Sequence, residues 1–186
     1  MTPANTEIQI PAVEDLRLRY FPDPVLRQRA APVGAIDAAL VARVRRMFEI
    51  MYEHHGIGLA APQVGALERV FVVNLTADRE QPEEERVYIN PQISSPEGEC
   101  TQEEGCLSFP EIRLDVVRPE RVQIRATDLE GEQFEESADG WLARCVQHEF
   151  DHLDGILFVG RVPIARRLMV RKQLKELERK YRDASK

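Results

Sequence analysis

Two histidines lie four residues apart in the segment HEFDH at positions 148–152. On a helix, residues four apart share one face, so both imidazole rings can reach a single metal ion. Glu149 lies between them and can act on a water at that ion without being a ligand itself. The alternative is a pair of solvated histidines on a helix surface. Apolar neighbours, Val146 and Leu153 among them, indicate a buried helix, where unpaired imidazoles and carboxylates are costly. We therefore favour a metal site.

A catalytic metal site needs a third protein ligand and an open position, so two histidines are not enough. The other two histidines, His54 and His55, follow a predicted helix. We interpret them as a helix-end pair, where the helix dipole favours a cation. Cys145 lies three residues before His148, but a row from 145 to 152 would span roughly 10 Å along the helix. We therefore expect Cys145 to be a small core residue.

Cys106 is the better candidate for the third ligand. It lies in the turn-like segment EGCLSFP at positions 104–110, far from the histidines in sequence, so it can approach an ion from another side. Gly105 beside it permits a close backbone approach. Cys100 lies in a polar stretch, and we assign it no role.

Three segments together resemble the signature motifs of the peptide deformylase family, in the family's order. They are GIGLAAPQ at 56–63, EGCLS at 104–108 and QHEFDH at 147–152. The segment PDPVLR at 22–27 is also similar to the family's N-terminal part, and the resemblance covers roughly 19–162. We find no departure at the motif positions.

The resemblance implies an α+β fold and a hydrolase that removes the N-formyl group from the formyl-methionine of new proteins. It implies that Cys106, His148 and His152 hold one divalent ion that lowers the pKa of a water. Glu149 would move the proton, which is typically worth about 10² to 10⁴ in rate. The side chain of Gln63 and the backbone N–H of Leu107 would stabilise the charge on the formyl oxygen.

The substrate-binding residues are also implied by the resemblance. They are Gly56, Ile57, Gly58 and Gly105. The segment 56–58 is not a phosphate loop, since no Lys-Ser/Thr pair follows it. The family implies instead an extended segment that pairs with the substrate backbone. The methionine side chain would enter an apolar pocket. Ile57, Trp141 and Cys145 are candidates for its wall, although each could be ordinary core.

Metal identity and the charges around the ligands are less constrained. One thiolate and two imidazoles suit Zn²⁺ by ligand type, whereas the family uses Fe²⁺ and accepts Ni²⁺, Co²⁺ or Zn²⁺. We expect Fe²⁺ as the working ion. Glu104, Arg118 and Asp151 could pair to orient the ligand helix, or they could be separate solvated charges. The N-terminal stretch before Asp15, the acidic loop at 80–85, Trp141 and Arg144 look more variable than the motifs, which bears on substrate preference rather than on the reaction.

The elements that must position these residues alternate along the chain. Helical periodicity predicts helices at 36–54 and 140–153, and Pro163 opens a final one. Strands are predicted at 69–75 and 86–93, a hairpin at 121–136 and a further strand at 156–162. We expect an α+β protein with mostly antiparallel sheets packed around a central metal-binding helix, and with a C-terminal helix.

Composition sets the remaining bounds. The chain has 186 residues, 43% of them hydrophobic, which suits one catalytic domain over 1–186 with an N-terminal extension at 1–15. No apolar run approaches the roughly 18–20 residues of a membrane span, and the start does not resemble a targeting signal, so we expect no membrane contact and a cytoplasmic location. Three cysteines argue against a disulfide framework.

The charge is divided unevenly. The net charge is −7, which disfavours a general nucleic-acid binder. Residues 164–186 hold nine Lys/Arg and three Asp/Glu, so they carry +6 and the remainder −13. The basic C-terminal helix, 163–186, is either a solvated helix packed on the domain or a dock for ribosomal RNA, as the family suggests. In the second case, removing it should spare activity on a short formyl peptide and weaken ribosome binding.

Two rival functions stay open. A peptide-cleaving metalloprotease would need a third ligand downstream of His152, and no His or Cys follows that position. An inactive binding module on a deformylase-like scaffold would not need Glu149, Gln63 and Cys106, all of which are present.

Overall fold

The computed structural model describes residues 10–182. A five-stranded antiparallel sheet has the strand order β1-β2-β3-β6-β7, and β4 and β5 form a second, two-stranded antiparallel sheet. The five strands are β1 (Gly58–Ala60), β2 (Val70–Val73), β3 (Arg86–Glu97), β6 (Arg121–Thr127) and β7 (Gln133–Asp139). The other two are β4 (Cys100–Cys106) and β5 (Phe109–Arg118).

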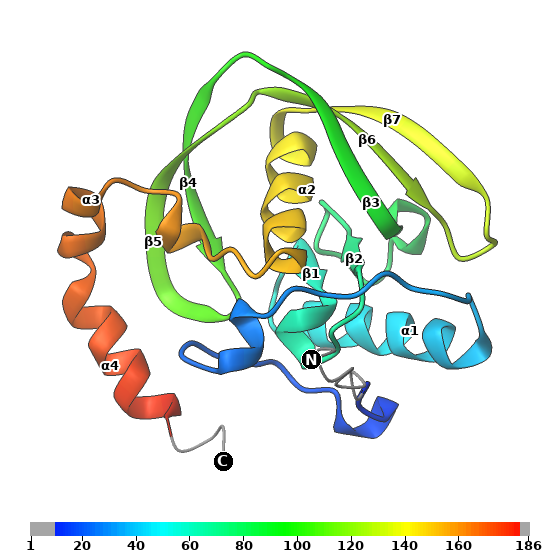
Figure 1. Ribbon diagram of the computed structural model, residues 1–186, viewed down its shortest axis with the longest axis horizontal. Coiled ribbons are helices and arrows are strands. Elements are labelled where there is room, and N and C mark those ends of the chain that lie inside the picture. Colours follow the sequence, from blue (N-terminus) through cyan, green and yellow to red (C-terminus); the bar gives the residue numbers. More distant parts are fainter. Residues whose placement is uncertain (1–9, 183–186) are drawn as a thin grey trace, which may run out of the picture.

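Helix α2 (Gly140–Leu153) lies at the centre, with the β4–β5 pair on one side and the larger sheet on the other (Figure 1). Helix α1 (Ala38–Glu53) lies near β1 and β2. Helices α3 (Ile164–Met169) and α4 (Arg171–Tyr181) follow along β5. Short 3-10 turns span Val13–Asp15, Pro24–Arg27, Ala61–Val64, Pro82–Glu84 and Phe158–Gly160. The expected α+β fold, with antiparallel sheets around a central helix, is confirmed.

The helices begin where the sequence provides a reason. Asp37 accepts a hydrogen bond from the backbone N–H of Leu40 at 2.8 Å, which caps the first turn of α1. Helix α2 begins at Gly140, whose φ of +51° lies in the left-handed region that glycine adopts without strain. Ten of the fourteen residues of α2 are buried, so this helix brings polar side chains into the interior.

Three hydrophobic clusters surround that helix. One joins α1 to β1 and β2, a second joins α2 to the larger sheet, and a third joins β5 to the chain after α2. Leu157, Phe158 and Val162 belong to the third cluster. The strand predicted at 156–162 is therefore wrong: this segment packs its apolar side chains onto β5 as an irregular chain with one 3-10 turn.

The final helix also differs from its prediction. Pro163 precedes it as the N-cap of α3, and Val170 separates α3 from α4, so there are two helices instead of one. Residues 183–186 of the predicted helix, and 1–9 of the predicted N-terminal extension, lie outside the described residues. Within 10–182, no helix has the length and apolar character to cross a membrane.

Candidate active site

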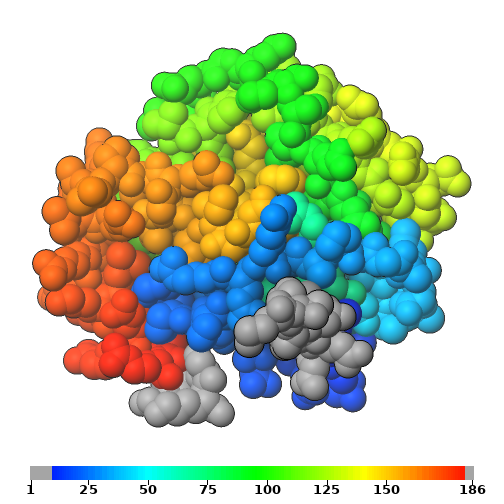
Figure 2. All heavy atoms as spheres, viewed as in Figure 1, coloured from blue at the N-terminus to red at the C-terminus, as the bar shows by residue number. Residues whose placement is uncertain are grey.

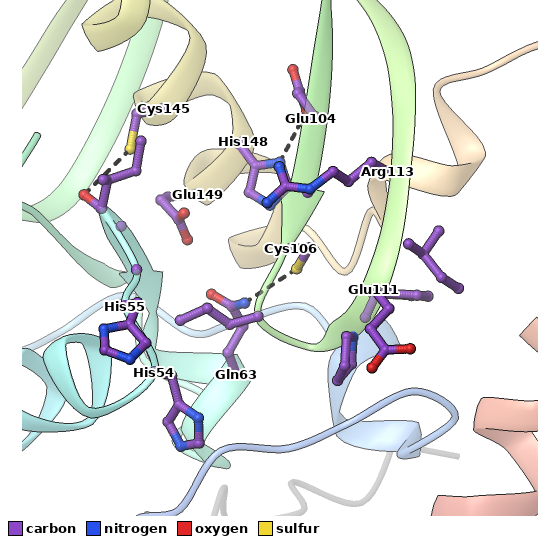
Figure 3. Close-up of a pocket in the computed structure, with 18 of the residues that line it drawn as sticks. His54, His55, Gln63, Glu104, Cys106, Glu111, Arg113, Cys145, His148 and Glu149 are labelled. Carbon is purple, nitrogen blue, oxygen red and sulfur yellow. Dashed lines mark hydrogen bonds and ion pairs between the residues drawn. The ribbon is translucent and has the colours of Figure 1, made fainter. Parts of the chain in front are cut away.

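A group of three side chains from two elements meets inside the protein. Ligand atoms of Cys106, His148 and His152 all lie within 4.8 Å of one another. Sγ of Cys106 is 3.3 Å from Nε2 of His152. Helix α2 carries both histidines, four residues apart and so on one face. Cys106 ends β4, so its sulfur approaches from the second sheet, and Figure 3 shows it near His148. The structure therefore brings together the three residues predicted as ligands.

The donor set fits a metal ion. Nδ1 of His152 is buried and has no hydrogen-bond partner among the described residues, while Nε2 faces the sulfur. Ions held by thiolate and imidazole have bonds of about 2.3 Å and 2.0–2.1 Å, so donors around one ion lie at most roughly 4.4 Å apart. The separation of Cys106 and His152 is within that limit. Burial lowers the pKa of His152, which keeps its ring neutral, as a metal ligand must be.

His148 is oriented by a carboxylate. Its Nδ1 lies 3.1 Å from Oε2 of Glu104, so Nε2 is the nitrogen available to an ion. Burial opposes a charge on His148, whereas its contacts with Cys106 and Glu104 raise its pKa. For an ion to bind Nε2 of His148, the proton on that nitrogen has to leave.

Glu104 belongs to a buried ion-pair network. Arg118 donates to both of its oxygens at 2.6 and 3.0 Å, and Arg144 donates to Oε1 at 2.5 Å. Arg118 also bonds Asp151 at 2.9 Å. Burial acts to raise the pKa of Glu104, but hydrogen bonds from His148 and Arg118 lower it to about 2. The interpretation of Glu104, Arg118 and Asp151 as separate solvated charges is therefore wrong.

Glu149 lies beside this group with a carboxyl group that is easily protonated. Burial raises its pKa to about 7, although the charges of His148 and Arg118 act to lower it. Its Oε2 is buried without a hydrogen-bond partner in the described part of the chain. A carboxyl group that gains and loses a proton near neutrality is suited to general acid–base work.

Gln63 has a defined amide orientation. The backbone N–H of Ala60 donates to its Oε1 at 2.8 Å, so the NH₂ group must point the other way. That NH₂ donates to Oγ of Ser108 at 3.2 Å and to Sγ of Cys106 at 3.4 Å. The amide therefore presents donors beside the predicted ligand, as Figure 3 shows.

One cleft of about 920 Å³ is lined by Gln63, Glu104, Cys106, Arg144, His148 and Glu149. His152, Arg118 and Asp151 are buried and are not part of its wall. Its wall includes the predicted substrate-binding residues Gly56, Ile57, Gly58 and Gly105, together with Leu107. Strand β1 is an edge strand of the larger sheet, so one of its sides is free to pair with an extended peptide. A Cβ added to Gly58 would lie 2.6 Å from Oε1 of Glu149, so the backbone approaches Glu149 more closely than any other residue type allows.

The remaining sequence candidates fall outside the ligand group. His54 and His55 lie at the end of α1 on the rim of the cleft. Cys145 is buried, with its sulfur 3.7 Å from the carbonyl oxygen of Ile57. Cys145, Ile57 and Trp141 all line the cleft. Cys100 begins β4, and its carbonyl oxygen accepts a hydrogen bond from Arg144 at 2.8 Å.

The sequence-based prediction missed the contact of Arg144 with Glu104 and the place of Tyr20 and Tyr181 in the cleft wall. Arg144 is expected from the sequence to be a variable position, yet it is buried and donates a hydrogen bond to Glu104. Its position four residues before His148 puts it on the same helix face, and that spacing was the available signal. Tyr20 and Tyr181 line the cleft from the two ends of the described chain, and no local pattern connects them.

An α+β fold around a helix that carries His, Glu and His, with a cysteine approaching from a second sheet, defines a metal-dependent hydrolase. The family model described as Polypeptide deformylase matches residues 16–167. The chain therefore belongs to the polypeptide deformylase family, whose enzymes remove N-formyl groups.

Individual relatives agree with that assignment. A peptide deformylase of Acidobacterium capsulatum is 48% identical over 86% of this chain and 93% of its own. One of Thermotoga neapolitana is 46% identical over 89% and 98% of the two chains. A crystal structure of peptide deformylase from Plasmodium falciparum superposes with a TM-score of 0.88 at 40% identity, covering 91% of this chain and 99% of that one.

Proposed function

We propose that this enzyme deformylates N-formyl-methionyl nascent peptides with one divalent ion held by Cys106, His148 and His152. The observation that carries this assignment is the meeting of these three ligand types within 4.8 Å, beside a partnerless oxygen of Glu149 in the described part of the chain. The bound ion would supply a Lewis acid that lowers the pKa of water towards about 7.

The chain's own residues would divide the remaining work. Glu149 takes a proton from the attacking water and delivers it to the departing amine, and its pKa of about 7 suits both steps. The amide of Gln63 and the backbone N–H of Leu107 donate to the formyl oxygen as it gains charge. The β1 edge, with the preceding Gly56 and Ile57 and with Gly58, pairs with the peptide backbone, while Gly105 of β4 lines the same cleft.

The methionine side chain would enter the apolar part of the cleft. Ile57, Trp141 and Cys145 line the cleft and are the candidates for the wall of this pocket. We expect the reaction to take place in the cytoplasm, where new chains emerge.

The working ion is proposed to be Fe²⁺, with Zn²⁺, Ni²⁺ or Co²⁺ as alternatives. All four accept one thiolate and two imidazoles. A thiolate at an iron site is exposed to oxidation, so Cys106 would be the residue damaged in air. Elemental analysis after purification without oxygen decides between them: iron at about one equivalent supports the proposal, and zinc alone contradicts it.

The activity is tested by release of formate from formyl-Met-Ala. Glu149→Ala should retain the metal, and its kcat should fall by a factor of about 10² to 10⁴. Glu135→Ala, an exposed change on β7, should keep full activity. Cleavage of internal peptide bonds in longer formyl peptides would support the metalloprotease instead. Failure of the intact, metal-loaded protein to release formate would support an inactive binding module.

We also propose that the basic C-terminal helices dock onto ribosomal RNA. Arg166, Arg167, Arg171, Lys172 and Lys175 are basic residues of these helices. Replacing Arg171, Lys172 and Lys175 by Ala should weaken co-sedimentation with ribosomes and reduce its salt dependence, because fewer phosphate contacts release fewer counterions. Ribosome binding equal to wild type would refute the docking and leave deformylation untouched.

A further inference from the structure

The cleft extends well beyond the reacting end. Its volume of about 920 Å³ lies near the upper end of the range for sites that enclose a drug-sized ligand. Its lining residues include His148 and Glu149, which lie apart from Glu111 in Figure 3, and also Tyr20 and Tyr181. A formyl-methionine placed against Glu149 fills only part of this space. We expect the later residues of the peptide to occupy part of the rest.

Two tyrosines from opposite ends of the described chain form part of that wall. The rings of Tyr20 and Tyr181 are stacked, with centroids 4.3 Å apart and planes inclined by 18°. Stacked aromatic side chains present a broad apolar surface, and their rigidity lowers the entropic cost of contact. Since both rings line the cleft, this surface faces the space that a peptide would occupy.

Tyr20 is fixed to the reacting end of the cleft by its neighbours in sequence. The backbone N–H of Arg19 donates to the carbonyl oxygen of Gln63 at 2.7 Å. The backbone N–H of Phe21 donates to the carbonyl oxygen of Ser108 at 3.0 Å. The two segments proposed to hold the formyl oxygen therefore also fix the position of Tyr20.

Tyr181 is fixed by the packing of α4. Leu177 is buried, and Leu174, Leu177 and Tyr181 pack in the third hydrophobic cluster with Ile112 and Leu114 of β5. The ammonium of Lys180 lies 5.1 Å from the Tyr181 ring centroid. Figure 2 shows α4, in red, against the N-terminal segment, in blue. The end of the C-terminal helix is therefore an integral part of the cleft wall.

We propose that the stacked pair of Tyr20 and Tyr181 binds the peptide residues downstream of the formyl-methionine, which makes the C-terminal helix part of the substrate site. This inference rests on the proposed deformylation and deepens it. An aromatic surface favours apolar and aromatic side chains over small polar ones. The enzyme thus selects peptides by the side chains of their third and fourth residues, through helix α4, which carries none of the three metal ligands.

The test compares formyl-Met-Ala-Phe-Phe with formyl-Met-Ala-Ser-Ser, which have the same length and the same reacting end. The wild-type enzyme should prefer the Phe peptide by about two- to tenfold in kcat/KM, through KM. Tyr181→Ala should abolish this preference, and Tyr181→Phe, which keeps the ring, should retain it. Gln173→Ala, an exposed change on the same helix, should behave as wild type.

A binding measurement separates this proposal from the reaction. Trp141 is the only tryptophan of the chain, lines the same cleft and is 56% exposed, so its fluorescence should report peptide binding. In a Glu149→Ala background, the Phe peptide should bind more tightly than the Ser peptide, and adding Tyr181→Ala should remove the difference. The double variant Tyr20→Ala with Tyr181→Ala should weaken binding of the Phe peptide no more than either single change, because removing one ring already abolishes the stacked pair.

Two results would overturn the proposal. One is equal binding of the two peptides by the wild-type cleft. The other is a preference that survives Tyr181→Ala. If the protein binds the Phe peptide selectively but releases no formate from formyl-Met-Ala, the proposed binding by Tyr20 and Tyr181 is supported and the proposed reaction is contradicted.

Discussion

Oε2 of Glu104 lies 3.1 Å from Nδ1 of His148, and both side chains are buried. The other carboxylate oxygen accepts from Arg118 at 2.6 Å and from Arg144 at 2.5 Å. Two cations thus hold one carboxylate, and that carboxylate orients the ring of a proposed metal ligand. Partners of this kind fix which nitrogen of a histidine faces an ion.

Glu104→Gln should therefore weaken metal binding. The neutral amide leaves Arg144 without its buried anion and loosens His148. We expect metal affinity to fall by about 10- to 100-fold and the free energy of unfolding by roughly 3–5 kcal/mol. Competition with a chelator measures the first and urea unfolding the second. Glu99→Gln, an exposed change, should alter neither. Unchanged affinity in Glu104→Gln would exclude the orienting role.

Gln63→Ala should lower kcat by about 10² to 10³ with little change in KM. The reason is that the Gln63 amide donates where charge develops, so its effect appears in the transition state. Gln63→Glu keeps the size of the side chain and the acceptor for Ala60 N–H but loses the donor. Its kcat should therefore fall by the same factor as that of Gln63→Ala. Rates are compared per bound metal. A loss confined to KM in both variants would show that Gln63 only binds substrate.

The long periodic elements could be predicted from the sequence because their patterns are local. The apolar spacing of 36–54 predicted α1, and 140–153 coincides with α2. The hairpin at 121–136 was predicted from alternation around a Glu-Gly turn, and it forms β6 and β7. The residue types at 106, 148 and 152 were sufficient to suggest a ligand set, since few residues bind transition metals.

Elements whose local residue pattern is weak or misleading, and contacts between residues far apart in the sequence, could not be predicted in this way. Strand β4 reads CTQEEGC, a mostly polar segment, and it becomes a strand only through its register with β5. Conversely, 156–162 is apolar enough for a strand but packs on β5 without pairing. The role of Arg144 depends on Glu104, forty residues away, and the stack of Tyr20 with Tyr181 joins the two ends of the described chain.

Gly58→Ala should lower kcat without releasing the metal. A Cβ at this position would lie 2.6 Å from Oε1 of Glu149 and 2.7 Å from Sγ of Cys145, so Glu149 must move. A misplacement of about 1 Å typically costs roughly 10²-fold in rate. Gly34→Ala meets no atom within 4 Å and should be silent. If Gly58→Ala retained the wild-type kcat, the close approach of β1 would have no part in placing Glu149.

Tyr52 should make the stability of the protein depend on pH in the alkaline range. Burial raises the pKa of Tyr52 to about 12, and the Glu85 carboxylate, which accepts its hydroxyl hydrogen bond at 2.8 Å, also raises it. The folded state therefore holds this proton more tightly than the unfolded chain. The contribution of Tyr52 is fully present below its unfolded pKa of about 10 and is lost as pH rises through about 12. The difference in unfolding free energy between wild type and Tyr52→Phe should shrink over that range.

Glu85→Gln should lower the pKa of Tyr52, measured as tyrosinate absorbance after subtracting the Tyr52→Phe curve. A wild-type Tyr52 that titrates near its ordinary pKa of about 10 would show that neither its burial nor Glu85 holds the proton.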